Sequence, residues 1–466
     1  MSWQDLERFD FRDKTVTVVG LGIEGVDMAR YLSRQGACVT ISDSKPQSSL
    51  QQQVAAVQDL PVNLALGSDQ SQPIEGAEVI FVSQGVPLDL PALAGARRRG
   101  IPLGSLMGLF LELCPGPMIG ITGSSGKTTT TALVGRMFEA DERPVFVGGN
   151  IGVAPLERLP EIRPYTWSVL EVSHTQLQLV QRSPHIAALL NLTPNHLDRF
   201  SWDEYRQLKA NILRFQTAND IAVLNRDDPE VEKLAPLVKG KIQWFSTRPG
   251  IPGDAVFVQQ RWAVRRVGRK IQPLFPLDSL RLRGAHNCAN AVAAAAIACA
   301  AGVSPEAIAC AVESFGGVPH RLELVGDANG VRFYNDSIAT TPERTLAGIR
   351  SFNEPLVLLL GGRHKNLPLD ELVAEASRRC RAVVLFGEAA GTIAGAFARY
   401  PGAPFVRVET LQAAVDAATR AAMRGDVVLL SPACTSYDAY DNFERRGEHF
   451  RSLVQALMKE VQPSRR

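Results

Sequence analysis

The stretch Met118-Ile-Gly-Ile-Thr-Gly-Ser-Ser-Gly-Lys-Thr-Thr-Thr-Thr131 decides the fold of this chain. Its apolar start indicates a buried strand, its glycines predict a loop, and residues 128–139 have the apolar periodicity of a helix. In a strand–loop–helix unit of this kind the loop N–H groups point at phosphate oxygens, and Lys127 supplies a cation. The Thr128 hydroxyl can bind Mg²⁺. The stretch therefore predicts a phosphate-binding loop, although it meets the common GxxxxGK[ST] pattern only loosely.

Length, charge and cysteine usage limit the classes of protein to which the chain can belong. A chain of 466 residues is expected to hold about two to four domains. Its 50 Lys and Arg residues nearly balance its 48 Asp and Glu residues without a basic stripe, so we expect a small-molecule substrate and no nucleic-acid or membrane partner. The seven cysteines form no CxxC pair, and we find neither a signal pattern nor a membrane-length apolar run. We therefore expect a cytoplasmic protein in a reducing compartment.

Residues 1–113 predict a nucleotide-binding domain. A strand is predicted at 15–19, a glycine-rich turn at Gly20-Leu-Gly-Ile-Glu-Gly25, and a second strand at 38–43 after an intervening helix. This βαβ unit with GxGxxG is typical of Rossmann folds, although the pattern also occurs in Rossmann-like folds that bind no ligand. Because the Glu24 carboxylate would repel a pyrophosphate, we expect the turn to contact the uridine end of a substrate rather than to cradle phosphate.

Residues 114–318 carry polar residues at the ends of predicted strands. Asn150, Glu171 and His196 each end or closely follow such a strand. A glutamate at the carboxyl end of a strand beside a phosphate loop predicts a second Mg²⁺ contact, and His196 is a candidate ligand of metal or substrate. An ordinary edge carboxylate and a loop imidazole remain the alternatives for these two residues.

Two predicted helices of this central part carry further candidates. Lys209 lies on an amphipathic helix, where the residue pattern alone indicates a solvent-exposed lysine. Asn287 and Asn290 share one face of a long alanine-rich helix, because they are three residues apart. They could bind an adenine or a metal-bound water, although helix capping alone would explain one of them.

Residues 319–466 predict a third α/β domain. Strands are predicted to begin at Val331, Leu356, Ala382, Phe405 and Asp426, with helices between them, which indicates another parallel sheet. The predicted fold class is therefore α/β, with a Rossmann-like domain (1–113), a P-loop ATPase-like domain (114–318) and a second Rossmann-like domain (319–466). Lys365 and Ser436 in strand-end loops could bind an anionic amine such as an amino diacid, although each could equally be an ordinary loop residue.

A set of motifs in a fixed order adds to this interpretation. The motifs are the GKT loop, Gly-Asn150-Ile-Gly, Glu171, Asn-x-Thr-x-x-His196-x-Asp-Arg, Lys209, His286-Asn287-x-x-Asn290, Pro319-His320-Arg321 and Asn335-Asp336-Ser337. This order closely resembles that of the Mur ligases of peptidoglycan synthesis, over almost the full chain. The resemblance implies a ligase in which ATP phosphorylates a carboxyl group and an incoming amine attacks the acyl phosphate to form an amide. It also implies two Mg²⁺ ions and a Lys209 that is carbamylated by CO₂.

The resemblance implies a role for each position that matches a family motif. Catalytic roles are implied for Lys127, His196 and Lys209, and metal binding for Thr128, Glu171, His196 and carbamylated Lys209. ATP contacts are implied for Gly123, Ser124, Ser125, Gly126, Lys127, Thr128, Thr129, Asn287, Asn290, Arg321 and Asp336. Contacts with a UDP-linked substrate are implied for Gly22, Ile23, Glu24, Asp43, Ser83, Asn150 and His196.

The C-terminal part indicates which amino acid is added. Residues 431–447, Ser-Pro-Ala-Cys-Thr-Ser-Tyr-Asp-Ala-Tyr-Asp-Asn-Phe-Glu-Arg-Arg-Gly, look like the signature of the D-glutamate-adding branch of the family. The match implies D-glutamate contacts for Thr340, Lys365, Ser436, Tyr437 and Phe443, with Lys365 pairing a carboxylate. The sequence departs from the family pattern at Ser83-Gln84-Gly85, at Ser173-His174-Thr175-Gln176 and at Ile338, where many members carry a lysine. One expected cation near the amino-acid site is therefore missing.

The function implied by the resemblance is the addition of D-glutamate to UDP-N-acetylmuramoyl-L-alanine, by a monomeric enzyme of cell-wall biogenesis, cell shape and cell division. A sibling ligase that adds L-alanine to a UDP-sugar is disfavoured by residues 431–447, and one that adds glutamate to a folate is disfavoured by the GxGxxG unit. A nicotinamide-dependent dehydrogenase or a nucleotide sensor would explain the first domain alone. It would leave Lys127, Glu171 and Lys209 without a role.

Overall fold

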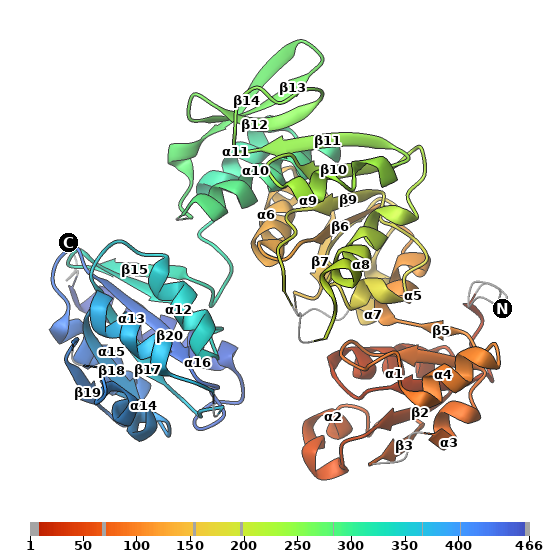
Figure 1. Cartoon of the computed structure of the whole chain (residues 1–466), viewed down its shortest axis with the longest axis horizontal. Coiled ribbons are helices and arrows are strands. Elements are labelled where there is room, and N and C mark those ends of the chain that lie inside the picture. Colours follow the sequence, from red (N-terminus) through yellow and green to blue (C-terminus); the bar gives the residue numbers. More distant parts are fainter. Residues whose placement is uncertain are drawn as a thin grey trace. The chain divides into compact units, whose positions relative to one another are not determined.

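The computed structural model describes residues 9–67, 71–151, 155–195, 199–282, 284–365, 367–400 and 402–461. These residues form three β-sheets with helices packed against them (Figure 1). By its internal contacts the chain divides into two compact units. The first unit holds Met1–Leu280 and Ala285–Ser314, and the second holds Arg281–Gly284 and Phe315–Arg466. Two of the sheets belong to the first unit and one to the second.

The N-terminal sheet of the first unit is parallel throughout, in the order β3-β2-β1-β4-β5. Its strands are β1 (Thr15–Val19), β2 (Cys38–Asp43), β3 (Val62–Leu66), β4 (Val79–Val82) and β5 (Leu103–Gly104). The helices of this part are α1 (Ile23–Arg34), α2 (Gln51–Ala55), α3 (Ser71–Glu75), α4 (Pro91–Arg98) and α5 (Leu106–Leu113). The predicted βαβ unit is confirmed, because α1 connects two strands that pair in parallel.

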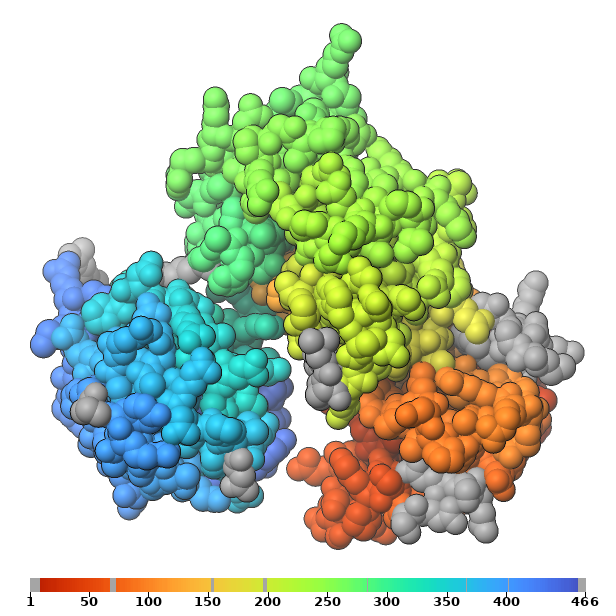
Figure 2. Space-filling model, in the orientation of Figure 1, coloured from red at the N-terminus to blue at the C-terminus, as the bar shows by residue number. Residues whose placement is uncertain are grey.

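The central sheet of the first unit has nine strands, in the order β14-β13-β12-β11-β10-β9-β6-β8-β7. They are β6 (Met118–Thr122), β7 (Val145–Gly149), β8 (Trp167–Glu171), β9 (Ile186–Leu189), β10 (Ile221–Asn225), β11 (Lys241–Ser246), β12 (Ala255–Gln259), β13 (Trp262–Val267) and β14 (Lys270–Pro276). Strand β13 runs antiparallel to β12 and β14, and this end of the sheet projects from the surface (Figures 1 and 2). The residue pattern does not predict this antiparallel edge, because Arg and Pro interrupt the apolar alternation of β13 and β14.

Among the described residues, six helices lie around the central sheet: α6 (Lys127–Ala140), α7 (Pro155–Arg158), α8 (Trp202–Arg214), α9 (Pro229–Glu232), α10 (Ala285–Ala300) and α11 (Pro305–Ser314). Helix α6 begins at the phosphate loop, and α10 contacts the loop through Asn290. Helix α6 packs against α10 and α11. Residues 290–299 of α10 are all buried and mostly alanine, and their small side chains let α6 approach closely. The predicted alanine-rich helix is therefore a buried layer of the first unit.

The second unit contains a six-stranded sheet in the order β15-β16-β20-β17-β18-β19. Its strands are β15 (Glu323–Ala328), β16 (Val331–Asn335), β17 (Leu356–Gly361), β18 (Cys380–Phe386), β19 (Phe405–Arg407) and β20 (Val427–Ala433). Its helices are α12 (Pro342–Arg350), α13 (Asp370–Arg379), α14 (Ala390–Phe397), α15 (Leu411–Ala421) and α16 (Phe443–Val461). All strands except the edge strand β15 are parallel, as predicted. In the ranges that the structure describes, no helix combines the length and the apolarity needed to cross a bilayer.

The central strands of this sheet are buried on both faces. Leu358 of β17 belongs to an apolar cluster with residues of α12, α13 and α14, whereas its neighbour Leu359 belongs to a cluster with residues of α15 and α16. Uninterrupted apolar runs are typical of parallel strands that helices cover on both sides. This explains why the apolar runs alone were enough to predict these strands.

A buried arginine joins the strand ends of the second unit. Arg446 of α16 is fully buried, and burial lowers its pKa to about 10. Its guanidinium donates hydrogen bonds to the carbonyl oxygens of Ser337 (2.9 Å), Gly361 (3.4 Å), Cys434 (3.2 Å) and Thr435 (3.1 Å). These acceptors lie at or just beyond the ends of β16, β17 and β20. The arginine therefore fixes the three strand-end loops of the second unit against α16.

We predict that Arg446→Met destabilises the second unit by about 3–5 kcal/mol, because it leaves buried carbonyl groups without their donor. Urea unfolding followed by circular dichroism measures the loss. Arg445→Met is the matched control, since Arg445 is exposed and pairs with Glu448 on the helix surface, and it should leave the unfolding curve unchanged. Equal stability of the two variants would contradict the role of Arg446.

Candidate active site

Neighbouring strands bring the candidate residues of the first unit to one edge of the central sheet. Strands β9, β6, β8 and β7 are adjacent and parallel, so their carboxyl ends lie side by side. In this register Ile121 of β6 lies opposite Glu171 of β8, and Thr122 lies opposite Leu189 of β9. The loops that follow these strands therefore meet at one place.

The loop between β6 and α6 has the geometry of a phosphate-binding loop. Gly126, the N-cap residue of α6, has a φ of 80°, which glycine adopts without strain. A Cβ atom at this position would lie 2.2 Å from Asn290 Oδ1 of α10, so glycine is also needed for close approach. Lys127 Nζ donates to the carbonyl oxygens of Gly123 (3.0 Å) and Ser124 (3.3 Å). The helix N-terminus and this lysine together favour an anion.

Asn191 holds this loop in place. Its Oδ1 accepts a hydrogen bond from Ser125 N (2.8 Å), its Nδ2 donates to Ser125 O (3.1 Å), and its carbonyl oxygen accepts from Ser124 N (3.0 Å). The sequence analysis missed this role, although Asn191 opens one of the quoted motifs and follows a strand next to the loop. Thr128 and Thr129 complete the predicted phosphate site in the first turn of α6, where both are half-buried.

Lys209 is buried, and the interpretation of it as a solvent-exposed lysine is wrong. It is 1% exposed, its Nζ donates to Thr122 Oγ1 at 3.2 Å, and it lies 5.1 Å from the ring centroid of Tyr205. Burial and the positive charge of Lys127 lower its pKa well below the usual value, and the Glu171 carboxylate opposes this shift. The spacing of Tyr205, Lys209 and Ile212 places the lysine on the apolar face of α8, and that signal could have revealed its burial.

Glu171 has one carboxylate oxygen without a donor. The residue is 2% exposed, and its Oε1 accepts a hydrogen bond from Asn150 Nδ2 at 2.9 Å. Its Oε2 is buried and has no hydrogen-bond partner among the described residues. A buried carboxylate oxygen of this kind is costly unless a cation meets it. Carboxylate oxygen is a preferred Mg²⁺ ligand, so Glu171 fits the predicted metal site.

The remaining parts of the predicted metal site are less defined. His196 lies outside the described residues, so its roles in catalysis, metal binding and substrate binding remain predictions. Among the residues that the structure describes, no group of three or more His, Cys, Asp or Glu side chains could hold a metal ion. The predicted ligand set does not depend on such a group, because it includes the Thr128 hydroxyl and the modified Lys209.

The two asparagines of α10 lie next to the phosphate loop. Asn290 Nδ2 donates a hydrogen bond to Asn287 Oδ1 at 3.1 Å, so both amides share one helix face as predicted. Asn290 is also the residue that a Cβ atom at Gly126 would touch. Their predicted contact with adenine remains a prediction.

The glycine-rich turn of the N-terminal sheet is linked to this region. Glu24 accepts hydrogen bonds from Gln84 N and Gln176 Nε2, both at 2.7 Å, and burial raises its pKa. Gln84 Nε2 donates to Asn150 Oδ1 at 3.4 Å. A chain of hydrogen bonds therefore runs from the N-terminal turn through Asn150 to Glu171.

The other residues predicted to contact a UDP-linked substrate surround the same turn. Asp43 Oδ2 accepts a hydrogen bond from Leu21 N (2.8 Å), and Ser83 Oγ donates to Gly20 O (2.7 Å). Gly22 is the N-cap residue of α1, and Ile23 after it is 74% exposed. The structure therefore brings these residues together, while their ligand stays a prediction.

Asp336 in the second unit points inward. Its Oδ2 accepts a hydrogen bond from Ser431 Oγ (2.7 Å), and its Oδ1 accepts one from Leu322 N (3.2 Å). Burial raises its pKa to about 7, although both hydrogen bonds oppose the shift. Arg321, the exposed residue before Leu322, is thereby fixed through its backbone.

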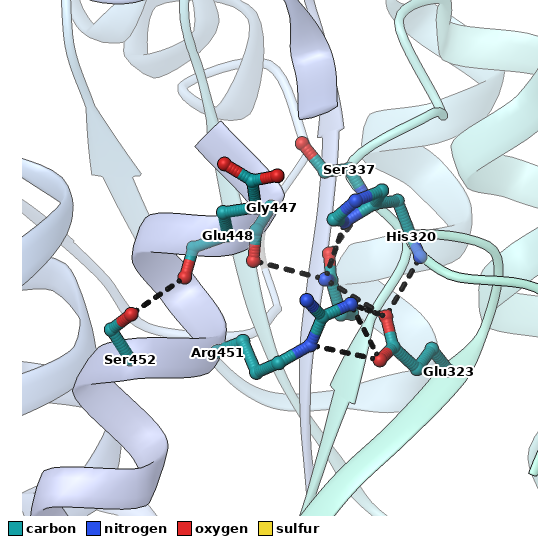
Figure 3. A network of polar contacts seen from close by, with 8 residues as sticks. His320, Glu323, Ser337, Gly447, Glu448, Arg451 and Ser452 are labelled. Atoms are coloured by element: carbon teal, nitrogen blue, oxygen red, sulfur yellow. Dashed lines mark hydrogen bonds and ion pairs between the residues drawn. The ribbon is translucent and has the colours of Figure 1, made fainter. Parts of the chain in front are cut away.

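A second polar network fixes the segment before Arg321 (Figure 3). Glu323 pairs with Arg451 at 2.8 Å and accepts hydrogen bonds from His320 N (2.7 Å) and Asn335 Nδ2 (3.2 Å). Asn335 Nδ2 also lies 3.0 Å from His320 Nδ1 and donates to Gly447 O at 3.1 Å. Burial lowers the pKa of His320, so the neutral imidazole is favoured.

Of the residues predicted to bind D-glutamate, all except Phe443 lie in the strand-end loops that Arg446 holds by hydrogen bonds. Lys365 Nζ donates to Thr340 Oγ1 at 3.5 Å, so the structure brings these two together. Ser436 is 2% exposed in the loop after β20, and its neighbour Tyr437 is 61% exposed. Phe443 begins α16, and its carbonyl oxygen accepts a hydrogen bond from Ser337 Oγ at 2.8 Å.

Comparison with known proteins identifies the family. Three domain families match successive parts of the chain: "Mur ligase MurD-like, N-terminal domain" at residues 14–105, "Mur ligase middle domain" at 121–298 and "Mur ligase, glutamate ligase domain" at 320–434. The UDP-N-acetylmuramoylalanine--D-glutamate ligase of Symbiobacterium thermophilum is 42% identical over 94% of this chain and 97% of its own length. The protein of the same name from Koribacter versatilis is 38% identical over 97% of this chain and 99% of its own. The chain belongs to the Mur ligase family.

Solved Mur ligase structures share the fold. The UDP-N-acetylmuramate-alanine ligase of Thermotoga maritima has a TM-score of 0.56 at 18% identity and covers 95% of this chain and 99% of its own. MurF of Acinetobacter baumannii has a TM-score of 0.53 at 21% identity, over 92% of this chain and 88% of its own. This Mur ligase therefore has the three consecutive α/β domains that the sequence predicts. The boundaries expected near residues 113 and 318 remain predictions, since the compact units separate at Ser314 and Phe315 and leave the first two sheets together.

We predict that the second unit of this Mur ligase is more stable at pH 5 than at pH 8. The folded-state pKa of Asp336 is raised from 3.8 to about 7, so the folded protein binds this proton more tightly than the unfolded chain does between these values. Stability therefore falls as the pH rises from 5 through the folded-state pKa of about 7, a span of about two pKa units, by at most about 3 kcal/mol at about 1.4 kcal/mol per unit. Urea midpoints measured by circular dichroism at both pH values test this.

Asp336→Asn is the control for this pH dependence. The amide is neutral, and it can accept from Leu322 N and donate to Ser431 Oγ in the same place. The variant should therefore show a smaller difference between the two pH values. A pH dependence equal to that of the unmodified protein would show that Asp336 is not its source.

Proposed function

We infer that this chain is an ATP-dependent ligase that joins D-glutamate to UDP-N-acetylmuramoyl-L-alanine in peptidoglycan synthesis. The observation that carries this conclusion is the 42% identity to a D-glutamate ligase over 94% of the chain, which spans all three sheets. The geometry supports it, because the phosphate loop, the buried Lys209 and the donor-free oxygen of Glu171 belong to one edge of the central sheet. A dehydrogenase or a nucleotide sensor would leave this arrangement unexplained.

The reaction has two steps. First, the terminal phosphoryl group moves from ATP to the carboxylate of the L-alanyl group, which gives an acyl phosphate and ADP. The amine of D-glutamate then attacks the acyl carbon, the C–O bond to phosphate breaks, and the amine loses a proton as the amide forms. His196 is the proposed acceptor of that proton, a role that its imidazole fills only while its acceptor nitrogen is not bound to Mg²⁺.

The chain's own residues supply a preorganised anion site for the first step. Lys127 exchanges its carbonyl partners Gly123 and Ser124 for phosphate oxygens, and the loop N–H groups bind the same oxygens. Asn287 and Asn290 address the nucleotide from α10. Asp336 acts on ATP through the backbone beside Arg321, because its own oxygens are bonded to Ser431 and Leu322.

The metal ligands are proposed from the chemistry of the donors. Thr128 and Glu171 would hold one Mg²⁺, and His196 and carbamylated Lys209 the other; the ions would neutralise charge on the transferring phosphoryl group. An unmodified lysine ammonium cannot bind a cation. Burial of Lys209 favours the neutral amine, which adds to CO₂ and releases one proton to give the carbamate anion.

The two organic substrates are assigned to the remaining candidate residues. The UDP-linked substrate binds at the N-terminal turn. The residues that contact it are Gly22, Ile23, Glu24, Asp43 and Ser83 of the N-terminal domain and Asn150 and His196 of the central domain. D-Glutamate contacts Thr340, Lys365, Ser436, Tyr437 and Phe443, where Lys365 pairs a carboxylate. We further propose that the enzyme acts as a monomer in the cytoplasm, where ATP is available.

We predict that the purified protein releases phosphate from ATP in the presence of Mg²⁺, UDP-N-acetylmuramoyl-L-alanine and D-glutamate, and not when L-glutamate replaces the D-isomer or no amino acid is added. A colorimetric phosphate assay measures the three reactions in parallel. Release that requires L-glutamate or another amine would keep the family and overturn the assigned substrate. The absence of release with every amine would overturn the ligase itself.

We predict that Lys209→Ala lowers the rate of phosphate release by at least about 100-fold, the size expected when one preorganised charge is removed from the transition state. With ¹³C-labelled bicarbonate, the unmodified protein should show a carbamate carbon resonance that the variant lacks. Lys233→Ala is the control, because Lys233 is an exposed lysine of the same unit that pairs with Glu230. A Lys209→Ala variant with the full rate, or unmodified protein without the carbamate signal, would contradict the carbamate.

A further inference from the structure

The second unit holds a cation, Arg344, near the proposed amino-acid site, and the proposed function gives it no role. This inference rests on the proposed function, in which the incoming amine is D-glutamate. D-Glutamate carries two carboxylates, and Lys365 is the only cation among the five residues assigned to it. If Lys365 binds one carboxylate, the other has no cationic partner among these five residues and would be bound by neutral donors alone.

Arg344 contacts the same turn as Lys365. Lys365 Nζ donates to Thr340 Oγ1 at 3.5 Å, and Thr340 N donates to Ile338 O at 2.8 Å. Arg344 Nη1 donates to the same Ile338 carbonyl oxygen at 3.3 Å. The two cations are therefore joined through the Ile338–Thr340 turn, which carries one of the proposed ligands of D-glutamate.

Arg344 is a cation without an ion-pair partner among the described residues of the second unit. Its side chain is exposed. Asp336 is within reach of its field, but the two oxygens of that carboxyl group are bonded to Ser431 and Leu322. One guanidinium N–H is used on Ile338, so the other donors stay available for a bidentate bond to a carboxylate.

The place of Arg344 on its helix is also unfavourable for a cation. Arg344 lies in the first turn of α12, where the helix dipole repels positive charge. Arg350 of the same helix shows the ordinary arrangement, because it lies in the last turn and pairs with Glu371 at 3.1 Å. The helix dipole therefore disfavours the positive charge of Arg344 at this place, and an anion bound at the turn would offset that unfavourable energy.

We propose that Arg344 is the second carboxylate-binding residue of the amino-acid site, so that Lys365 binds one carboxylate of D-glutamate and Arg344 binds the other. Arg344 then supplies the cation that the sequence lacks at Ile338, where many Mur ligases carry a lysine. The cation of this enzyme comes from α12 instead of from the turn itself. Arg344 is in this sense a specificity-determining residue for a dicarboxylic amine.

Steady-state kinetics of Arg344→Ala test this proposal. The KM for D-glutamate should rise about 10- to 100-fold, the loss expected for one charge-assisted hydrogen bond. The KM for ATP should stay within about threefold, since one pairwise contact with the amino acid is removed. Arg350→Ala is the matched control on the same helix and should leave both KM values unchanged. A variant with an unchanged KM for D-glutamate, or with an increase only in the KM for ATP, overturns the proposal.

A charge-swap variant separates binding from a structural role. The double variant Ile338→Lys/Arg344→Ala has a cation at the turn again. Its KM for D-glutamate should be lower than that of Arg344→Ala by at least about fivefold; if Arg344 only held the turn through its hydrogen bond to Ile338, the new lysine would not lower KM.

Arg344→Gln, which can still donate to Ile338 O, is used if Arg344→Ala does not fold, and it should show the same rise in the KM for D-glutamate. Failure of the swap to lower KM overturns the proposal. Two results are distinguishable. If the unmodified protein does not release phosphate with D-glutamate, the proposed function is wrong; if it does and the Arg344 variant has the same KM, only the role of Arg344 is wrong.

Discussion

The parallel register of β6 with β8 and β9 is the constraint on which the first unit depends. Because a parallel sheet sends every strand-end loop to the same edge, residues far apart in sequence must meet there. Asn191 then shapes the phosphate loop, and Asn150 orients Glu171. A slip of one residue in β6 would turn Thr122 away from Lys209 and exchange the side chains that face the two sides of the sheet, both of which are buried. Catalytic geometry and core packing are therefore set by the same pairing.

Buried charge is handled differently in the two units. In the second unit Arg446 meets carbonyl oxygens at three strand ends, and Asp336 meets two donors, so both groups are satisfied by the protein and stabilise its loops. Among the described residues of the first unit, Glu171 keeps one oxygen without a donor, and Lys209 has a single hydroxyl acceptor. Incomplete satisfaction of buried polar groups is costly, and natural proteins accept that cost mainly where a ligand or a chemical step completes the set.

The sequence predicts the parts of this molecule that local chemistry controls. Apolar runs and glycines predicted strands of all three sheets and the phosphate loop, because each depends on a few adjacent residues. The antiparallel edge β12–β14 was missed because Arg and Pro mask its alternation. Lys209 and Asn191 depend on which strand covers them, and Arg446 depends on carbonyl groups about 10 to 110 residues away, so no local pattern reveals their partners. The family resemblance supplied some of what local patterns could not, because the motif order marked Lys209 as a functional residue.

The division into two compact units has a consequence for spectroscopy. Trp167, Trp202, Trp244 and Trp262 belong to the first unit and Trp3 lies outside the described residues, whereas the sequence of the second unit contains tyrosines but no tryptophan. The fluorescence of these four tryptophans therefore reports on the first unit, and we expect it to change little when only the second unit unfolds. Trp202 stacks on Tyr205, whose hydroxyl donates to Ser124 of that loop, so its emission is coupled to the loop itself. Tryptophan fluorescence can thus distinguish unfolding of the first unit from unfolding of the second in the unlabelled protein.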